Sequence, residues 1–373
     1  MHLEGPDGRS TIIESDGPAA LMIRRVDFDA LLLALARDVG ADFVPGVDVV
    51  QAREEHDRVV VVARDGRRFE APVVIAADGV HSVVARRLGL NPGWPAHAIA
   101  LDMMEETPRE LLRDVDSSTL WVAYGYEGTG FRTDVGTETR PHRAVDETGP
   151  WSGPRRAPEG YAYIFPKRDH VNIGIGYVLS YYRAEVDVAP YDLQQGLVDR
   201  LHRRGIVAGS SVRRNFTPFL IPVGGPLRRP GRGRVLLAGD AGGFVNGFTA
   251  EGIYYAMVTG DLAARTIIAS SEAKTLAKRY AAACSYEIGS ELRDSVLIQR
   301  YLFSDRRRIA RVIEGAEHER ETTRLVLDFA MGRVSYAKLR RTILFRSPRL
   351  ASRLVWSLLL KNPLRRAAAV TTI

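Results

Sequence analysis

Apolar residues follow two different patterns in the first hundred positions. Over residues 27–39 they return every three or four positions and Gly40 follows, which predicts an amphipathic helix. Residues 59–63 and 73–77 are short, nearly continuous apolar runs, which predict buried strands. Residues 82–88 follow with a basic end and predict a short helix.

From about residue 92 the pattern changes to strand-like segments rich in aromatic residues. These segments are residues 120–124, 161–165, 171–177 and 216–222. Residues 125–159 are rich in Gly, Pro, Thr and charge, and they predict a long surface excursion. Residues 191–203 predict a helix, and after residue 262 the pattern is almost entirely helical.

This order of segments predicts a two-domain α/β (α+β) protein. Strand–helix–strand pieces precede an antiparallel insertion, and a strand–turn–helix segment follows it, which implies that a Rossmann-like domain is discontinuous in sequence. We predict this domain at residues 25–92 and 223–285, and an antiparallel β domain at residues 1–24 and 93–222. Residues 286–373 are expected to form a helical C-terminal region with a basic tail.

Composition narrows the class of protein. Hydrophobic residues make up 45% of the 373 positions, enough for a sizeable core. No uncharged apolar run reaches the ~18 residues that a membrane span needs, and the first ten residues contain no signal-peptide core. Cys284 is the only cysteine, which excludes an internal disulfide and a cysteine-based metal cluster and favours a reducing, cytoplasmic location. We expect it to be a small, buried helix residue.

The net charge of +7 is concentrated at the C-terminal end. After Asp328 there are ten Lys and Arg residues and no acidic residue, so the rest of the chain carries a net charge of −3. One helical stripe carries Arg346, Arg349 and Arg353. This stripe favours either binding to the anionic inner surface of a membrane or packing on the body of the protein with the charges in solvent. Nucleic acid is disfavoured, because the main body is not basic.

One segment, residues 234–264, combines features that are typical of a ligand-binding site. An apolar run ends at Gly239 and Asp240, a glycine-rich loop follows, and Gly252 and Ile253 begin a predicted helix. A carboxylate at the end of a buried strand suits the hydroxyl groups of a polyol such as the ribityl chain of a flavin. The free amides of a helix start suit an electron-rich ligand edge. As an isolated pattern, Asp240 is equally typical of a helix N-cap.

Four blocks in order carry a resemblance to a known family. They are R-V-D-F-D-A-L-L at residues 25–32, V-V-I-A-A-D-G-V-H-S-V-V-A-R-R-L-G-L at 73–90, G-Y-A-Y-I-F-P-K-R-D-H-V-N-I-G-I-G at 160–176 and G-D-A-G-G-F-V-N-G-F-T-A-E-G-I at 239–253. Together they make the chain similar to the geranylgeranyl reductase family of flavin-dependent oxidoreductases, within the larger group that contains p-hydroxybenzoate hydroxylase. The resemblance implies that the Rossmann-like domain binds FAD and that the antiparallel domain binds substrate.

The resemblance also implies site residues. Flavin contacts are expected at Arg25, Val49, Asp78, Gly239, Asp240, Gly252 and Ile253. Among them, Arg25 would lie near phosphate and ribose oxygens, the backbone of Val49 near the adenine, and Asp240 against the ribityl hydroxyls. The amides of Gly252 and Ile253 would face the pyrimidine end of the isoalloxazine. Asp78, followed by glycine, is also typical of an ordinary turn at a strand end.

Tyr161, Tyr163 and Phe165 alternate along one predicted strand, which favours either core packing or the lining of an isoprenoid pocket. Tyr163 stands where a tryptophan is common in the family. The chain contains no G-x-G-x-x-G string, the usual pyrophosphate loop of such flavoproteins. We therefore expect the family's first βαβ unit to lie before residue 1, as it would if the reading frame were started late.

The resemblance implies an FAD-dependent enzyme that reduces C=C bonds of a polyprenyl chain, in an isoprenoid lipid or a quinone. NADPH or ferredoxin would supply the electrons. Reduction of such a bond needs an acid or an ordered water, and the sequence identifies no catalytic residue. Two alternatives stay open: an aromatic or terpenoid monooxygenase, and a non-catalytic lipid-surface or partner-binding protein that holds flavin weakly. Oligomeric state is not predicted.

Overall fold

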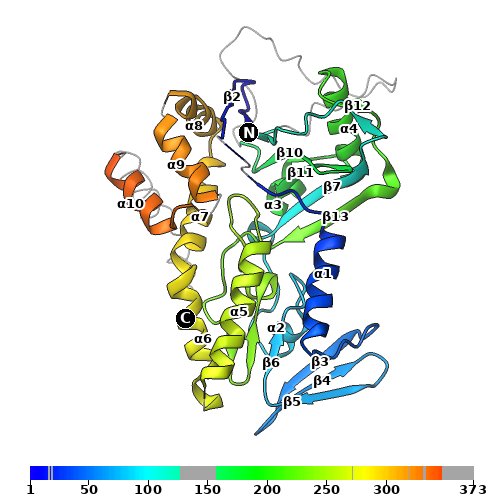
Figure 1. The fold of residues 1–373 in the computed structure, drawn as a ribbon, viewed down its shortest axis with the longest axis vertical. Helices are drawn as coiled ribbons and strands as arrows, with labels where there is room; N and C mark the ends of the chain where they lie inside the picture. Colours follow the sequence, from blue (N-terminus) through cyan, green and yellow to red (C-terminus); the bar gives the residue numbers. More distant parts are fainter. Residues whose placement is uncertain are drawn as a thin grey trace, which may run out of the picture. The chain divides into compact units, whose positions relative to one another are not determined.

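The computed structural model describes residues 1–346, apart from residues 16, 18, 19, 127–156, 271, 319, 331 and 332. The chain forms two compact units, each built from three separate segments (Figure 1). Unit 1 consists of Met1–Met22, Asp102–Pro218 and Tyr301–Arg333, and unit 2 consists of Ile23–Leu101, Phe219–Arg300 and Val334–Ile373. The mixed α/β class that the sequence predicts is confirmed.

A seven-stranded sheet dominates unit 1, with the strand order β13-β7-β11-β10-β9-β1-β2. Its strands are β1 (His2–Glu4), β2 (Ser10–Ile12), β7 (Ala100–Pro108), β9 (Trp121–Tyr124), β10 (Gly160–Pro166), β11 (His170–Val178) and β13 (Phe216–Ile221). A separate pair joins β8 (Leu112–Arg113) to β12 (Ala208–Gly209). The aromatic strands expected near residues 121, 161 and 171 are therefore confirmed.

The two faces of this sheet differ because side chains alternate along each strand. Ala162 and Ile164 of β10 pair with Ile175 and Ile173 of β11, and all four are buried. Helix α4 (Pro190–Arg203) covers this side: the side chain of Gln194 donates a hydrogen bond of 2.9 Å to the Ile173 carbonyl. The short helix α3 (Leu179–Glu185) also packs on β11. The opposite face carries the aromatic residues of β10.

Unit 2 contains two small sheets. In one, β15 (Val235–Leu237) lies between β14 (Gly231–Arg232) and β6 (Val74–Ala76), antiparallel to the first and parallel to the second. In the other, β3 (Val49–Glu54), β4 (Val59–Ala63) and β5 (Arg68–Ala71) form an antiparallel meander. Helix α2 (Val83–Arg87) packs on β3.

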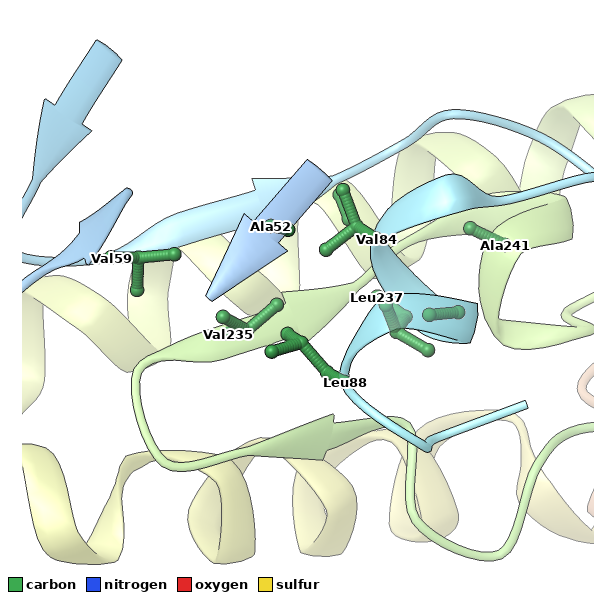
Figure 2. Packing of buried hydrophobic residues seen from close by; sticks show 9 residues of the cluster. Ala52, Val59, Val84, Leu88, Val235, Leu237 and Ala241 are labelled. Carbon is green, nitrogen blue, oxygen red and sulfur yellow. The ribbon is translucent and has the colours of Figure 1, made fainter. Parts of the chain in front are cut away.

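The core of unit 2 gathers around β15, whose three residues are fully buried, as the apolar run predicts. Figure 2 shows Val235 and Leu237 beside Val84 and Leu88, with Ala52, Val59 and Ala241 completing the labelled cluster. A strand buried on both faces must be apolar at every position, which is why this segment lacks an alternating pattern.

Six α-helices follow β15 in the described chain. They are α5 (Ile253–Ala269), α6 (Ala273–Glu287), α7 (Gly289–Leu302), α8 (Arg306–His318), α9 (Arg320–Ala330) and α10 (Tyr336–Arg346). α5 and α6 lie side by side (Figure 1), and the hydroxyl of Tyr280 on α6 donates a 2.7 Å hydrogen bond to the Leu237 carbonyl. Cys284 is buried on α6, as expected, and burial raises its pKa to about 11. None of the described helices is long and apolar enough to cross a membrane.

Helix α1 (Arg25–Asp38) forms where the pattern predicts it, but none of its residues is buried. Val26, Leu31 and Leu35 keep 63%, 55% and 53% of their surface exposed, although their spacing is that of a packed helix face. The apolar stripe of α1 therefore has no covering element in the part of the chain that the structure describes.

Candidate functional site

The predicted flavin contacts are organised around one edge of the β14-β15-β6 sheet. Because β6 and β15 are parallel, with Ala76 opposite Leu237, their carboxyl ends meet at the same edge. Asp78 follows β6 by two residues, and Asp240 follows β15 by three. The structure thus brings to one edge two carboxylates that are 162 positions apart in sequence.

Asp240 lies in a 3₁₀ turn, Gly239–Gly242, that directly follows β15. Gly239 has a φ of +56°, which a side chain would strain, and its amide donates a 3.0 Å hydrogen bond to Thr259 Oγ1 of α5. Burial raises the pKa of the Asp240 carboxyl, and the charge of Arg25 opposes this rise in part. Within the described residues, no hydrogen bond reaches this carboxylate. Asp240 is half-buried, and a charged acceptor without a protein donor leaves its hydrogen bonds to water or to a ligand.

The start of α5 lies next to this carboxylate. A Cβ atom at Gly252 would lie 3.4 Å from Asp240 Oδ1 and 3.4 Å from Val245 Cγ2, so the glycine keeps this space open. The preceding loop is fixed by Asn246, whose side-chain oxygen accepts hydrogen bonds from the amides of Phe248 and Thr249. The amides of Gly252 and Ile253 make no hydrogen bond within the described chain and remain available at the positive end of the helix.

The guanidinium of Arg25, at the start of α1, interacts electrostatically with the carboxylate of Asp240. Its guanidinium donates hydrogen bonds to Asp29, one turn along the helix, with a shortest distance of 2.9 Å. The Asp29 carboxylate, followed by Asp240 and Glu251, raises the pKa of Arg25. The charges of Arg25 and Asp240 thus interact, and a flavin contact at either residue stays a prediction.

Asp78 and Val49 both have structural roles in unit 2. The carboxylate of Asp78 accepts hydrogen bonds from Ser82 Oγ, the N-cap of α2, at 2.5 Å and from the Val84 amide at 3.1 Å, so it stabilises the start of α2. Val49 begins β3 in the other sheet, opposite Ala63. A flavin contact at either residue stays a prediction.

The residues around Asp240 fit part of a flavin. An acceptor-only carboxylate without a donor suits ribityl hydroxyls, and two free amides beside it suit the electron-rich pyrimidine end of the isoalloxazine. The glycine between them leaves room for a ligand where any side chain would touch the carboxylate. The chemistry of this donor and acceptor set is therefore compatible with FAD.

In unit 1, one face of the seven-stranded sheet carries a row of aromatic rings. The ring centroids of Tyr124 and Tyr161 are 5.4 Å apart, those of Tyr161 and Tyr163 6.1 Å, and those of Tyr163 and Phe165 4.5 Å. Phe303 approaches Tyr124 with a centroid separation of 6.5 Å. Tyr163 is buried, whereas Tyr161 and Phe165 are half-buried.

An acidic residue that no sequence pattern indicates, Asp102, also lies on this face. Asp102 of β7 accepts hydrogen bonds from the Tyr163 hydroxyl at 3.1 and 3.3 Å. Burial raises the pKa of Asp102 to about 7, and the Tyr163 hydrogen bond opposes this rise. The pair is separated by 61 residues in sequence, so no local spacing could have indicated it.

Comparisons with known proteins find an FAD binding domain and similar curated proteins. The FAD binding domain family matches residues 2–153. Digeranylgeranylglycerophospholipid reductase 2 of Methanothermobacter thermautotrophicus is 28% identical over 309 residues, which cover 80% of this chain and 69% of that protein. Protein FixC of Salmonella typhi is 26% identical over 264 residues, 69% of this chain and 56% of FixC.

A solved structure supports the fold. A geranylgeranyl bacteriochlorophyll reductase-like protein from Thermoplasma acidophilum superimposes with a TM-score of 0.65 and 18% identity, over 95% of this chain and 81% of that one. Among the curated relatives compared, the share of the relative's own length that is matched runs from 48 to 77%.

Proposed function

We propose that this chain, a member of the FAD-dependent oxidoreductase family, reduces carbon–carbon double bonds of a polyprenyl chain. The substrate class is that named for its reductase relatives, which act on geranylgeranyl groups of lipids or diphosphates according to their names. The observation that carries the proposal is the aromatic row of unit 1, Tyr124, Tyr161, Tyr163 and Phe165. Such a surface suits an apolar, unsaturated chain better than a charged or polyhydroxylated one.

The residues of unit 2 would hold the cofactor. Asp240 would accept hydrogen bonds from the ribityl hydroxyls, while the amides of Gly252 and Ile253 would donate to the pyrimidine end of the isoalloxazine. Arg25 would pair with phosphate or ribose oxygens. When bound and reduced, the flavin supplies the hydride for the double bond.

Electron supply and cellular location are further parts of the proposal. An external donor such as NADPH or ferredoxin would reduce the flavin between turnovers. The enzyme would work in the cytoplasm, at the inner surface of the membrane, where its lipid or quinone substrate resides. The ten basic residues after Asp328 support this placement, because anionic lipid headgroups attract such a segment.

The reaction can be tested without knowledge of the natural donor. The purified chain is incubated anaerobically with FAD, dithionite and geranylgeranyl diphosphate or a geranylgeranylated glycerophospholipid, and products are analysed by mass spectrometry. We expect products that gain two hydrogens per reduced bond. Products that form only with oxygen and gain an oxygen atom would favour a monooxygenase instead. Failure to retain FAD after desalting, together with no product, would favour a non-catalytic protein.

A further inference from the structure

We propose that Glu291 of α7 is a positioning residue for the flavin. Through the hydroxyl of Tyr255, it holds the loop 246–251 and the first turn of α5. The amides of Gly252 and Ile253, which the proposed function directs at the flavin, stand at the junction of this loop and this turn. The inference rests on the proposed function and concerns residues of unit 2 alone.

The loop 246–251 is closed by the backbone of Asn246. Its amide donates a 2.9 Å hydrogen bond to the Glu251 carbonyl, and its carbonyl accepts one of 2.9 Å from the Ala250 amide. Ala250 has a φ of +57°, a left-handed conformation that is unfavourable for a residue with a side chain. A loop that contains such a residue keeps its conformation only where the surrounding structure holds it.

Helix α7 holds the loop from one of its faces. Ser295 Oγ accepts a 2.8 Å hydrogen bond from the Gly247 amide, and Glu291 lies four positions earlier, one turn along the helix. A Cβ atom at Gly247 would lie 2.9 Å from Val296 Cγ2 and 3.1 Å from Val296 Cα, so the loop backbone packs directly on α7. The position of the loop is thus tied to this helix.

A second connection is a chain of hydrogen bonds that ends on Glu291. The side-chain nitrogen of Asn246 donates to the Tyr255 hydroxyl at 3.4 Å, and this hydroxyl donates to Glu291 Oε1. The side-chain oxygen of Asn246 accepts from the amides of Phe248 and Thr249 inside the loop. Tyr255 lies in the first turn of α5. One carboxylate therefore connects the start of the loop and the start of the helix to α7.

The three side chains of this chain are buried together. Asn246, Tyr255 and Glu291 are 9%, 3% and 8% exposed. Burial raises the pKa of Tyr255, followed by its hydrogen bond to Glu291, so the phenol keeps its proton and remains a donor. Burial raises the pKa of Glu291 as well, and the Tyr255 hydrogen bond opposes this rise. Because a buried polar group that loses its partner is costly, the network favours one arrangement of the loop.

The same helix offers a matched control. Asp294, three positions from Glu291, accepts a 2.7 Å hydrogen bond from the Tyr336 hydroxyl of α10 and pairs with Arg340 at 2.8 Å. This pair joins α7 to α10, whereas Glu291 joins α7 to α5. Tyr336→Phe therefore removes a tyrosine–carboxylate hydrogen bond from α7 but leaves the connection to the loop 246–251 in place.

The first test uses the FAD-free protein and hydrogen exchange followed by mass spectrometry. Glu291→Leu replaces the carboxylate by an apolar side chain of similar size, which a buried position tolerates, but leaves the Tyr255 hydroxyl without its acceptor. We expect faster exchange of the amides in the loop 246–251 and unchanged exchange in β15. Glu291→Gln keeps an acceptor oxygen for Tyr255, so this variant and Tyr336→Phe should exchange as the wild type does.

The second test is titration of the same variants with FAD, followed by flavin fluorescence. Glu291→Leu should weaken FAD binding about tenfold, and Tyr255→Phe by a similar factor, whereas Glu291→Gln and Tyr336→Phe keep the wild-type affinity. Because Glu291 acts through Tyr255, Glu291→Leu should change the dissociation constant less than about twofold in the Tyr255→Phe background. Two independent contributions would instead multiply to about a hundredfold.

The outcomes separate this inference from the proposed function. Wild-type exchange in Glu291→Leu, or faster exchange with unchanged FAD affinity, would overturn the positioning role and leave the reductase proposal intact. Equal losses in Glu291→Gln and Glu291→Leu would also contradict it, because the hydrogen bond would then not be the cause. If Glu291→Leu does not fold, Tyr255→Phe, which removes the same connection, decides the question. A wild type that holds no FAD after desalting would overturn the flavin site itself.

Discussion

At the scale of single residues, Asp78 and Asp240 show how one sheet edge gives two carboxylates different roles. Asp78 accepts two hydrogen bonds from the start of α2, so its charge is compensated within the fold. Asp240 accepts none from the described chain, and burial raises its pKa. The first carboxylate therefore stabilises the folded protein, whereas the second costs stability that a ligand would restore.

We predict that Asp240→Asn makes the FAD-free protein more stable and weakens FAD binding. The folded-state pKa of Asp240 lies above its unfolded value, so the free energy of unfolding falls as pH rises from about 4 through the folded pKa. The variant should thus have a higher Tm at pH 7, with a smaller gain at about pH 4. Loss of a charged acceptor for a ribityl hydroxyl should weaken FAD binding about tenfold or more.

Asp78→Ala is the control for this prediction. It removes two bonds from the start of α2, so we expect a loss of about 1–2 kcal/mol in the free energy of unfolding. Calorimetry of both variants over pH, with FAD titrations followed by flavin fluorescence, checks the contrast. A destabilised Asp240→Asn protein would show that the carboxylate already has a donor in the folded chain.

The site residues that sequence reasoning predicted are those with local signals. Asp240 and Gly252 belong to one strand–turn–helix segment, in which a short apolar run, glycines and a helix start follow each other directly. Asp102 has no such signal, because its partner lies two strands away and 61 residues later. A Cβ atom at Gly174 would lie 2.4 Å from the Tyr163 hydroxyl oxygen, and the role of this glycine can be recognised only once the register of β10 and β11 is known.

At the scale of elements, the strands that alternate or are wholly apolar were predictable, and β7 was not. β4 and β10 lie where the pattern places them, and α4 begins and ends within one residue of its predicted range. β7 reads A-L-D-M-M-E-E-T-P, with carboxylates on both faces, so no period-two apolar signal exists. Glu105 is fully buried, and its Oε2 accepts hydrogen bonds from Ser211 and Val212, contacts that only the tertiary structure supplies.

Helix α1 leads to a prediction about packing. Since Leu35 is 53% exposed, Leu35→Ala should change the free energy of unfolding by no more than about 0.5 kcal/mol. Leu237→Ala, in the fully buried β15, should cost about 2–5 kcal/mol. Urea unfolding of both variants measures the difference. Similar losses in the two variants would mean that the apolar stripe of α1 is covered in the folded protein in solution.

At the scale of the whole molecule, each compact unit is assembled from three segments of the chain. The predicted domain boundaries, and the assignment of cofactor and substrate domains, stay predictions. Because both units need distant segments, neither corresponds to one continuous stretch of sequence. Variants of the full chain, rather than excised fragments, are therefore the suitable material for testing either site.

The uneven charge of the whole chain gives the last prediction. Residues 347–373 lie outside the described residues, and they include the five basic residues Arg349, Arg353, Lys361, Arg365 and Arg366. Their removal lowers the net charge from +7 to +2. At about 1 kcal/mol per basic residue near an anionic surface, binding to phosphatidylglycerol vesicles should fall about a thousandfold or more.

Vesicle sedimentation of the full chain and of the chain ending at Arg346 checks this prediction. Binding should weaken with added salt and be absent with phosphatidylcholine alone, because the attraction is electrostatic. Exchange of Arg349 and Arg353 for lysine preserves the charge and should preserve binding. If the segment instead packs on the body through its guanidinium groups, the lysine variant loses thermal stability and both chains bind vesicles equally, which would remove the support for work at a membrane surface.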